Sequence, residues 1–147
     1  MSLTDLNHML SHAYRHGYAV GAFAIHDLES LNGVMAAAEA ARAPVLLTPD
    51  TPDEAHRELL LPAMEAAARR AGVPVAIQVT VAADPDAAAR AIRLGCNGVR
   101  LATSEASFPR SVQQVQAAAA TGRDCGVAIQ AAPSQDTVST AAEAKQF

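Results

Sequence analysis

One unit recurs along the chain and limits the folds open to it: a short apolar run followed by a longer segment with helical spacing. The apolar runs predict strands at residues 18–25, 44–48, 74–79, 98–102 and 126–131. The other segments predict helices at residues 4–15, 27–41, 54–71, 84–94 and 108–120. Strands that alternate with helices of this length favour a parallel sheet with right-handed crossovers.

The length of the chain limits which parallel architecture it can form. A complete (β/α)₈ barrel needs about 250 residues, whereas this chain has 147. We therefore predict an α/β domain over residues 1–132 that is either an open doubly wound sheet or slightly more than half of a barrel. Residues 133–147 are small and polar, so we predict a C-terminal tail with weak helical potential.

Local signals predict where the elements begin and end. Thr4 is placed to cap the first helix. Gly17 and Gly122 are expected to end helices, because glycine readily adopts the left-handed backbone of a helix C-terminus. The first strand, residues 18–25, is continuously apolar, so we expect it to be buried.

Composition excludes several classes of protein. A net charge of −4 and a pI of about 5.6 argue against a nucleic-acid-binding surface. No apolar run approaches the roughly 20 residues of a membrane span, and the first ten residues lack the basic-then-apolar order of a signal peptide. Cys96 and Cys125 form neither a disulfide framework nor a zinc cluster. We therefore expect a soluble, cytoplasmic, reduced protein with structural thiols.

The first strand and the turn after it resemble a known family. Residues 17–31 are Gly-Tyr-Ala-Val-Gly-Ala-Phe-Ala-Ile-His-Asp-Leu-Glu-Ser-Leu, which is similar to the opening of the class II, zinc-dependent ketose-bisphosphate aldolases, close to the tagatose-bisphosphate branch. Residues 43–47, 74–78 and 95–101 are similar to the next three strands of that family, in unbroken order. The resemblance implies a TIM barrel with its active site at the C-terminal ends of the strands.

The same resemblance places departures from the family at these strand ends. Ala24 stands where the family has an Asn that contacts substrate. Thr80 stands at the position of the catalytic Asp, and Val81 at that of a zinc-ligating His. In the family the fourth strand ends in an Asp that is followed by Ser-His, whereas this chain has Ala102 and then Ser104 and Glu105. The fifth strand of the family carries two Glu residues, and this chain has Ala128 and Gln130 there.

Aldol cleavage by this family needs zinc as a Lewis acid and a carboxylate that moves a proton. Zinc in turn needs about three protein ligands. Among the predicted strand ends, only Glu105 offers a carboxylate and only His26 an imidazole. Val81 cannot coordinate a metal, and the hydroxyl of Thr80 cannot act as a base near neutral pH. We therefore expect no cofactor, and a degenerate, non-catalytic aldolase-like protein that is truncated relative to the family.

Polar residues at the predicted strand ends form a candidate ligand pocket. Its members are His26, Asp27, Gln78, Thr80, Ser104, Glu105 and Gln130. Neutral side chains suit a site without metal, because buried carboxylates and histidines are costly when no metal compensates them. Two interpretations remain open: neutral filler in a former pocket, or a site for a neutral or phosphorylated molecule such as a sugar phosphate. Asp27 also fits as the cap of the helix that follows it.

Three histidines on the first helix form a second candidate site. His8, His12 and His16 recur every four residues, so they share one helix face. The spacing of His8 and His12 suits a transition metal, although no carboxylate or cysteine obviously completes the set. The alternative interpretation is a solvated face.

A partial barrel leaves the outer edges of its first and fifth strands unpaired. We also expect it to expose the inner side chains Val20, Leu46, Ile77 and Leu101. The chain is therefore predicted to form a homodimer or a hetero-oligomer through these edges, including one with a complete aldolase chain. This leaves an alternative function, a subunit of an active zinc-dependent fructose- or tagatose-bisphosphate aldolase (an aldehyde-lyase of carbohydrate metabolism) whose missing ligands come from another chain.

Overall fold

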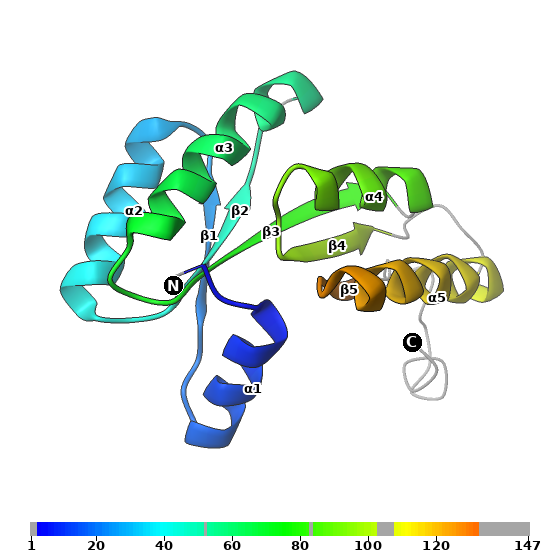
Figure 1. Ribbon diagram of the computed structural model, residues 1–147, viewed down its shortest axis with the longest axis horizontal. Coiled ribbons are helices and arrows are strands. Elements are labelled where there is room, and N and C mark those ends of the chain that lie inside the picture. The colour runs from blue at the N-terminus through cyan, green and yellow to red at the C-terminus, as the bar shows by residue number, and fades with distance from the viewer. Residues whose placement is uncertain (1–2, 52, 83, 103–107, 133–147) are drawn as a thin grey trace.

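The computed structural model describes residues 3–51, 53–82, 84–102 and 108–132 (Figure 1). The helices are α1 (Leu6–His16), α2 (Leu28–Ala41), α3 (Glu54–Arg70), α4 (Pro85–Arg93) and α5 (Phe108–Cys125). The strands are β1 (Gly21–Ile25), β2 (Val45–Pro49), β3 (Val75–Ala82), β4 (Gly98–Ala102) and β5 (Ala128–Ala132). The predicted order of helices and strands is confirmed. In the described part of the chain, no helix has the length and apolar character needed to cross a membrane.

The five strands form one parallel sheet in the order β1-β2-β3-β4-β5. Each strand lies beside its predecessor, whereas a doubly wound sheet reverses its strand order at a switch point. Residues of α2, α3, α4 and α5 all join one hydrophobic cluster on one face of the sheet. A sheet wound in one direction with the four helices that connect its strands on one face is a partial TIM barrel, so that prediction is confirmed and the doubly wound alternative is excluded.

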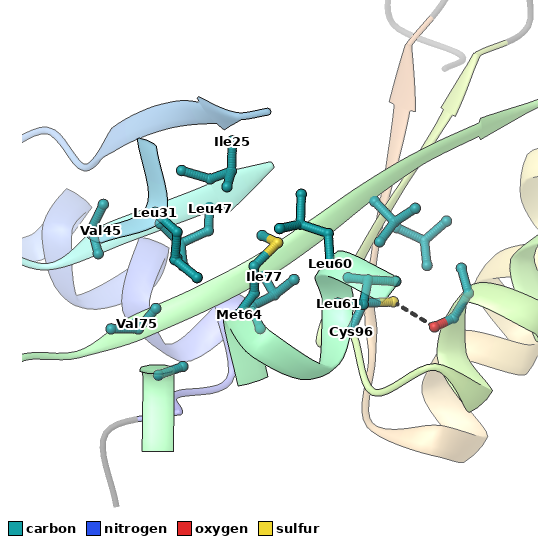
Figure 2. Packing of buried hydrophobic residues seen from close by; sticks show 14 of the residues in the cluster. Ile25, Leu31, Val45, Leu47, Leu60, Leu61, Met64, Val75, Ile77 and Cys96 are labelled. Atoms are coloured by element: carbon teal, nitrogen blue, oxygen red, sulfur yellow. Dashed lines mark hydrogen bonds between the residues drawn. The ribbon is translucent and has the colours of Figure 1, made fainter. Parts of the chain in front are cut away.

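The face of the sheet that packs against α2–α5, here called the outer face, carries the main core (Figure 2). Alternate strand residues such as Leu47, Ile77 and Leu101 are at most 1% exposed there. From the helices, Leu61 and Met64 of α3 pack against them. Period-2 alternation directs these side chains to one side of the sheet, and the helices exclude water from them.

The opposite, inner face is covered in part by α1. Leu6 and Met9 of α1 form a small second cluster with Leu46, Ala76 and Ala128. The backbone N–H of Thr4 donates to the carbonyl of Val75 at 2.8 Å, which fixes the start of α1 to the sheet. At Gly98, an added Cβ would lie 2.6 Å from Cδ2 of Leu6, so the absence of a side chain at Gly98 lets α1 approach.

The expectation that Val20, Leu46, Ile77 and Leu101 are exposed inner side chains is wrong. Ile77 and Leu101 belong to the outer face and are buried under the helices. Leu46 does lie on the inner face, but α1 covers it, and Val20 is half-buried against the same cluster. The apolar runs carry apolar residues on both faces, so their composition does not reveal which alternate set meets the helices.

The prediction of a buried first strand is also wrong. Residues 21–24 of β1 are exposed, and Phe23 is 46% exposed. In the described sheet β1 is an edge strand, and it pairs with β2 alone. A continuous apolar sequence therefore does not by itself place a strand in the centre of the sheet.

Two helix ends differ from their predicted positions. Asp5, not Thr4, caps α1, because its Oδ1 accepts the backbone N–H of His8 at 2.7 Å. Gly122 does not end α5, which continues to Cys125. A Cβ at Gly122 would lie 2.5 Å from Cγ1 of Ile129, so this glycine permits close packing of α5 on β5. Gly17 does end α1, with a φ of 69°.

The two cysteines lie in different environments. Cys96 is buried, and its Sγ donates to the carbonyl of Ala91 at 3.1 Å (Figure 2). Burial raises the pKa of the Cys96 thiol to about 11, so the unreactive thiol form dominates at neutral pH. Cys125 is exposed at the end of α5. The structural interpretation is thus supported for Cys96.

Candidate functional site

The polar part of the inner face lies towards the C-terminal ends of β3, β4 and β5. Thr80, Arg100 and Gln130 are register partners across these strands, so their side chains share one face. Two residues earlier on these strands, Gln78 is the register partner of Gly98. Because parallel barrels place their ligands at this end of the strands, the row Thr80–Arg100–Gln130 occupies the position expected for a site.

Two glutamines of this face are joined directly. Nε2 of Gln78 donates to Oε1 of Gln130 at 2.9 Å. The bond reaches from β3 to β5 across Gly98 of β4, whose missing side chain leaves room for it. Gln78 is 6% exposed and Gln130 is exposed, so the bond satisfies a buried amide and holds the exposed one in a fixed direction.

Arg100 is the charged side chain of this row. It is exposed between Thr80 and Gln130, and it has no ion pair among the described residues. A guanidinium offers five N–H donors in a planar fork that suits carboxylate or phosphate oxygens. With its neutral neighbours, Arg100 gives this face a single positive charge suited to an anionic ligand.

The predicted residues His26 and Asp27 lie at the end of β1, in a separate hydrogen-bonded group. Nδ1 of His26 lies 3.0 Å from the carbonyl oxygen of Asp50 and 3.7 Å from its Oδ2. Asp27 caps α2, because its Oδ1 accepts the backbone N–H of Ser30 at 2.7 Å. This hydrogen bond lowers the pKa of the Asp27 carboxyl. The capping interpretation of Asp27 is therefore the one that its contacts support.

The structure thus brings together only part of the predicted pocket. Gln78, Thr80 and Gln130 share the inner face, whereas the side chain of His26 contacts Asp50 and the side chain of Asp27 accepts from Ser30. Ser104 and Glu105 lie outside the described residues.

Sequence reasoning missed two polar residues of these strand ends. Arg100 is two residues after Gly98, so the period of a strand places it on the face of the pair that includes Gln78. Asp50 directly follows β2 and meets His26. The alternation of β4 was the available signal for Arg100, and the position after β2 was the signal for Asp50.

The residues described here do not fit the zinc site that the family resemblance implies. No group of three or more His, Cys, Asp or Glu side chains gathers for a metal ion within the described ranges. Thr80 offers only a hydroxyl, and Val81 packs against the helices of the outer face. The position assigned to a zinc-ligating histidine therefore carries an apolar side chain on the opposite face of the sheet from Thr80.

The histidines of α1 lie at the other end of the sheet. Nδ1 of His12 is 2.8 Å from the hydroxyl of Tyr18, and the His12 ring stacks on His16 with 4.0 Å between centroids. Nδ1 of His16 lies 2.8 Å from the carbonyl of His12. His8 and His12 belong to no group of three metal-ligating side chains in the described structure.

The fold and the strand-end site define a parallel α/β protein of the barrel type. Comparison with solved structures agrees: the chain is similar to the YdjI aldolase from Escherichia coli K12, with a TM-score of 0.79, 24% identity, and coverage of 88% of this chain and 51% of that one. It is also similar to a Coccidioides immitis protein solved as a candidate fructose-1,6-bisphosphate aldolase, with a TM-score of 0.77, 23% identity, and coverage of 86% and 45%. The chain spans about half the length of these structures.

The sequence comparison is more specific than the structural one. The model of the class II fructose-bisphosphate aldolase family matches residues 4–134, which include every described strand. This chain belongs to the class II fructose-bisphosphate aldolase family, as the resemblance of residues 17–31 predicts.

Proposed function

We propose that this chain is a non-catalytic class II aldolase-like protein that binds a sugar phosphate on its inner face. One observation supports the proposal: the row Thr80–Arg100–Gln130 presents a hydroxyl, a guanidinium and an amide. The family resemblance assigns a catalytic carboxylate to the position of Thr80. Polar but uncharged neighbours beside one cation suit recognition of a phosphorylated polyol.

Each group has a distinct part in this binding. The guanidinium of Arg100 donates to two phosphate oxygens, in the bidentate geometry that makes such contacts strong. The Thr80 hydroxyl and the Gln130 amide exchange hydrogen bonds with sugar hydroxyls. Gln78 positions Gln130 through the 2.9 Å bond. None of these groups is a base near neutral pH, so the sugar phosphate binds and leaves unchanged.

Calorimetric titration of the 147-residue chain with fructose 1,6-bisphosphate, in buffer with a chelator, tests the binding. We expect metal-independent binding that Arg100→Gln weakens about tenfold or more, since a charge-assisted bidentate contact is lost. Arg123→Gln is the matched control, because Arg123 is an exposed arginine of α5. Equal weakening by both substitutions, or no binding by the wild-type chain, contradicts the proposal.

A cleavage assay tests the non-catalytic part. Fructose and tagatose bisphosphates are incubated with the chain, with and without added zinc, and triose phosphates are measured. We expect no cleavage above the rate without protein. Zinc-dependent cleavage by the chain alone supports the alternative of an active subunit instead. The same holds if the chain, mixed with a complete aldolase from the same cells, raises the rate above that of the aldolase itself.

We also propose that β1 is an interface with another aldolase-like chain. The exposure of residues 21–24 supports this, because an outer strand presents unpaired backbone groups to a partner strand. Light scattering after size exclusion is expected to give twice the mass of one chain, and Ala24→Pro is expected to reduce it to one. A monomeric wild-type chain that also fails to bind a complete aldolase contradicts this proposal.

A further inference from the structure

A cavity of about 710 Å³ lies at the opposite end of the strands from the proposed sugar-phosphate face. It is bounded by α1 and by the segments that lead into three strands: Tyr18 precedes β1, Arg42 precedes β2 and Pro74 precedes β3. Its volume falls within the range of about 300–1,000 Å³ that small-molecule sites occupy. The cavity is large enough to hold a small organic molecule.

The lining of this cavity has one electrostatic character. Met9, Pro44 and Pro74 contribute apolar walls. The basic side chains of the lining are His8, His12 and Arg42, and the lining includes no carboxylate. A largely apolar cavity that holds basic but no acidic side chains is complementary to a molecule with a negative head and an apolar body.

The imidazole of His12 is held in a defined orientation. Its Nδ1 is 2.8 Å from the hydroxyl of Tyr18, and its ring stacks on His16. The contact with Tyr18 leaves Nε2 as the second hydrogen-bonding atom of the His12 ring. Desolvation lowers the pKa of His12, and Coulombic interactions with His16, Arg15 and His8 lower it further.

Arg42 provides an independent observation. It caps α2 in the left-handed region, with φ 50° and ψ 39°. It is the one non-glycine residue with positive φ among the described residues, and the others with positive φ are Gly17, Gly95 and Gly126. Local backbone preference therefore favours glycine at this position. Arg42 therefore occupies a backbone conformation that disfavours a side chain, and it has no ion-pair partner in the described chain, so its charge is available to a ligand in the cavity that it lines.

We propose that this cavity binds a small organic oxyanion with a compact apolar body. The phosphate or carboxylate head contacts Arg42 and Nε2 of His12, and the apolar body lies against Met9, Pro44 and Pro74. The apolar body distinguishes this ligand from the polyhydroxylated sugar phosphate proposed for the inner face. Because the two sites lie at opposite ends of the strands, each is tested without the other.

Phenyl phosphate is the probe, titrated into the isotope-labelled 147-residue chain and followed by NMR signals of the imidazoles and by calorimetry. We expect saturable shifts of the His8 and His12 signals. Benzoate is expected to bind the same site if the head group is general. Inorganic phosphate lacks the body and benzyl alcohol lacks the charge, so each is expected to bind at least about tenfold more weakly. Equal affinity for either of these two fragments overturns the proposed ligand class.

Arg42→Gly is the decisive variant, because it removes the charge and relieves the left-handed backbone together. We expect affinity for phenyl phosphate to fall about tenfold or more while the thermal midpoint stays equal or rises. Arg70→Gly is the matched control, since Arg70 is an exposed arginine at the end of α3 that does not line the cavity; it is expected to leave affinity within about twofold.

A second variant keeps the proposal testable whatever Arg42→Gly does to folding. Tyr18→Phe keeps the ring but removes the hydroxyl that orients His12, so affinity is expected to fall about threefold or more. Unchanged affinity in both Arg42→Gly and Tyr18→Phe, or shifts confined to Gln78 and Gln130 on the inner face, overturns the proposal.

Discussion

The two faces of one sheet differ in what covers them, and consecutive residues of β2 show the difference. Leu47 points to the outer face, is 0% exposed and packs under the helices (Figure 2). Leu46 points to the inner face, is 9% exposed and meets α1. The outer face is almost entirely apolar, whereas the inner face changes from apolar beneath α1 to polar at Thr80 and Gln130.

The residues that hold the fold together and the residues proposed to bind a ligand therefore lie on opposite faces of the sheet. Helix packing on the outer face supplies most of the buried apolar area, so the fold does not depend on which polar groups end the strands. A member of the family can therefore lose its charged strand-end residues and keep its architecture. Four experiments test this separation of the two faces.

The largest effect is expected from Leu47→Ala, which opens a cavity in the outer core. It should reduce the free energy of unfolding by about 3–4 kcal/mol, whereas Leu46→Ala should reduce it by about 2 kcal/mol, because α1 can move to fill the space. Urea unfolding followed by circular dichroism measures both. A loss from Leu46→Ala as large as that from Leu47→Ala would show that α1 is as firmly packed as the outer helices.

A smaller effect is expected where α1 approaches the sheet. Gly98→Ala places a Cβ 2.6 Å from Leu6 and should cost about 1–3 kcal/mol by displacing α1. Gly33→Ala is the matched control, since nothing lies within 4 Å of its added Cβ. Within α2 this change should stabilise the protein by about 0.5–1 kcal/mol. Thermal unfolding reports both signs, and a neutral Gly98→Ala would contradict the α1 contact.

Restoring the family's residues at the end of β3 separates the faces by chemistry. The double variant Thr80→Asp with Val81→His should not bind zinc stoichiometrically, because Val81 packs on the outer face and the described residues hold no group of further metal ligands. Val81→His alone should cost about 1–2 kcal/mol by placing a polar ring against the helices, and Thr80→Asp about 0.5 kcal/mol or less. Metal analysis after dialysis measures the zinc content of the double variant. One zinc per chain would contradict the facial assignment.

Acid should weaken the helix layer without acting on the inner face. Asp27 and Asp53 cap α2 and α3, and their hydrogen bonds to Ser30 and His56 lower the pKa of each carboxyl below 3.8. Because the folded-state pKa is depressed, this stability is present above pH 3.8 and is lost as the pH falls through the folded-state pKa.

The substitution Asp27→Asn isolates the acid effect of one cap. Asparagine retains a capping oxygen but does not titrate, so stability should fall less steeply between pH 5 and pH 2 than in the wild-type chain. Unfolding midpoints across this pH range measure the slopes. Gln78→Ala, on the non-titrating inner face, should leave the wild-type slope unchanged, and identical slopes for Asp27→Asn and wild type would contradict the role of the cap.

The order of elements was predictable from the sequence, because strands and helices differ in length and periodicity even in an alanine-rich chain. Periodicity alone did not predict the winding of the sheet, since half a barrel and a doubly wound sheet contain the same units; the family resemblance predicted the barrel. The faces of the strands were also obscured. Ile77 and Leu101 lie in runs that are apolar at most positions, and only register and helix packing assign them to the outer face.

The candidate site was predictable in part. Gln78, Thr80 and Gln130 follow from family positions and do share a face. Arg100 was missed because only the last residue of its strand, Ala102, was compared with the family. Alternation within β4 nevertheless places Arg100 beside Thr80. His26 separates from this group because its ring meets Asp50, which follows a different strand. Such a contact depends on the path of the chain after β2 and has no local signal.

The proposed function requires that the inner face bind a sugar phosphate and perform no chemistry on it. The most direct test follows the side-chain amide signals of Gln78 and Gln130 by NMR while fructose 1,6-bisphosphate is added to the labelled chain, first with a chelator and then with zinc. We expect saturable shifts of both amide signals that are the same with chelator and with zinc, and an intact sugar phosphate at the end. Unmoved amide signals, or shifts that require zinc and are followed by triose phosphates, would contradict it.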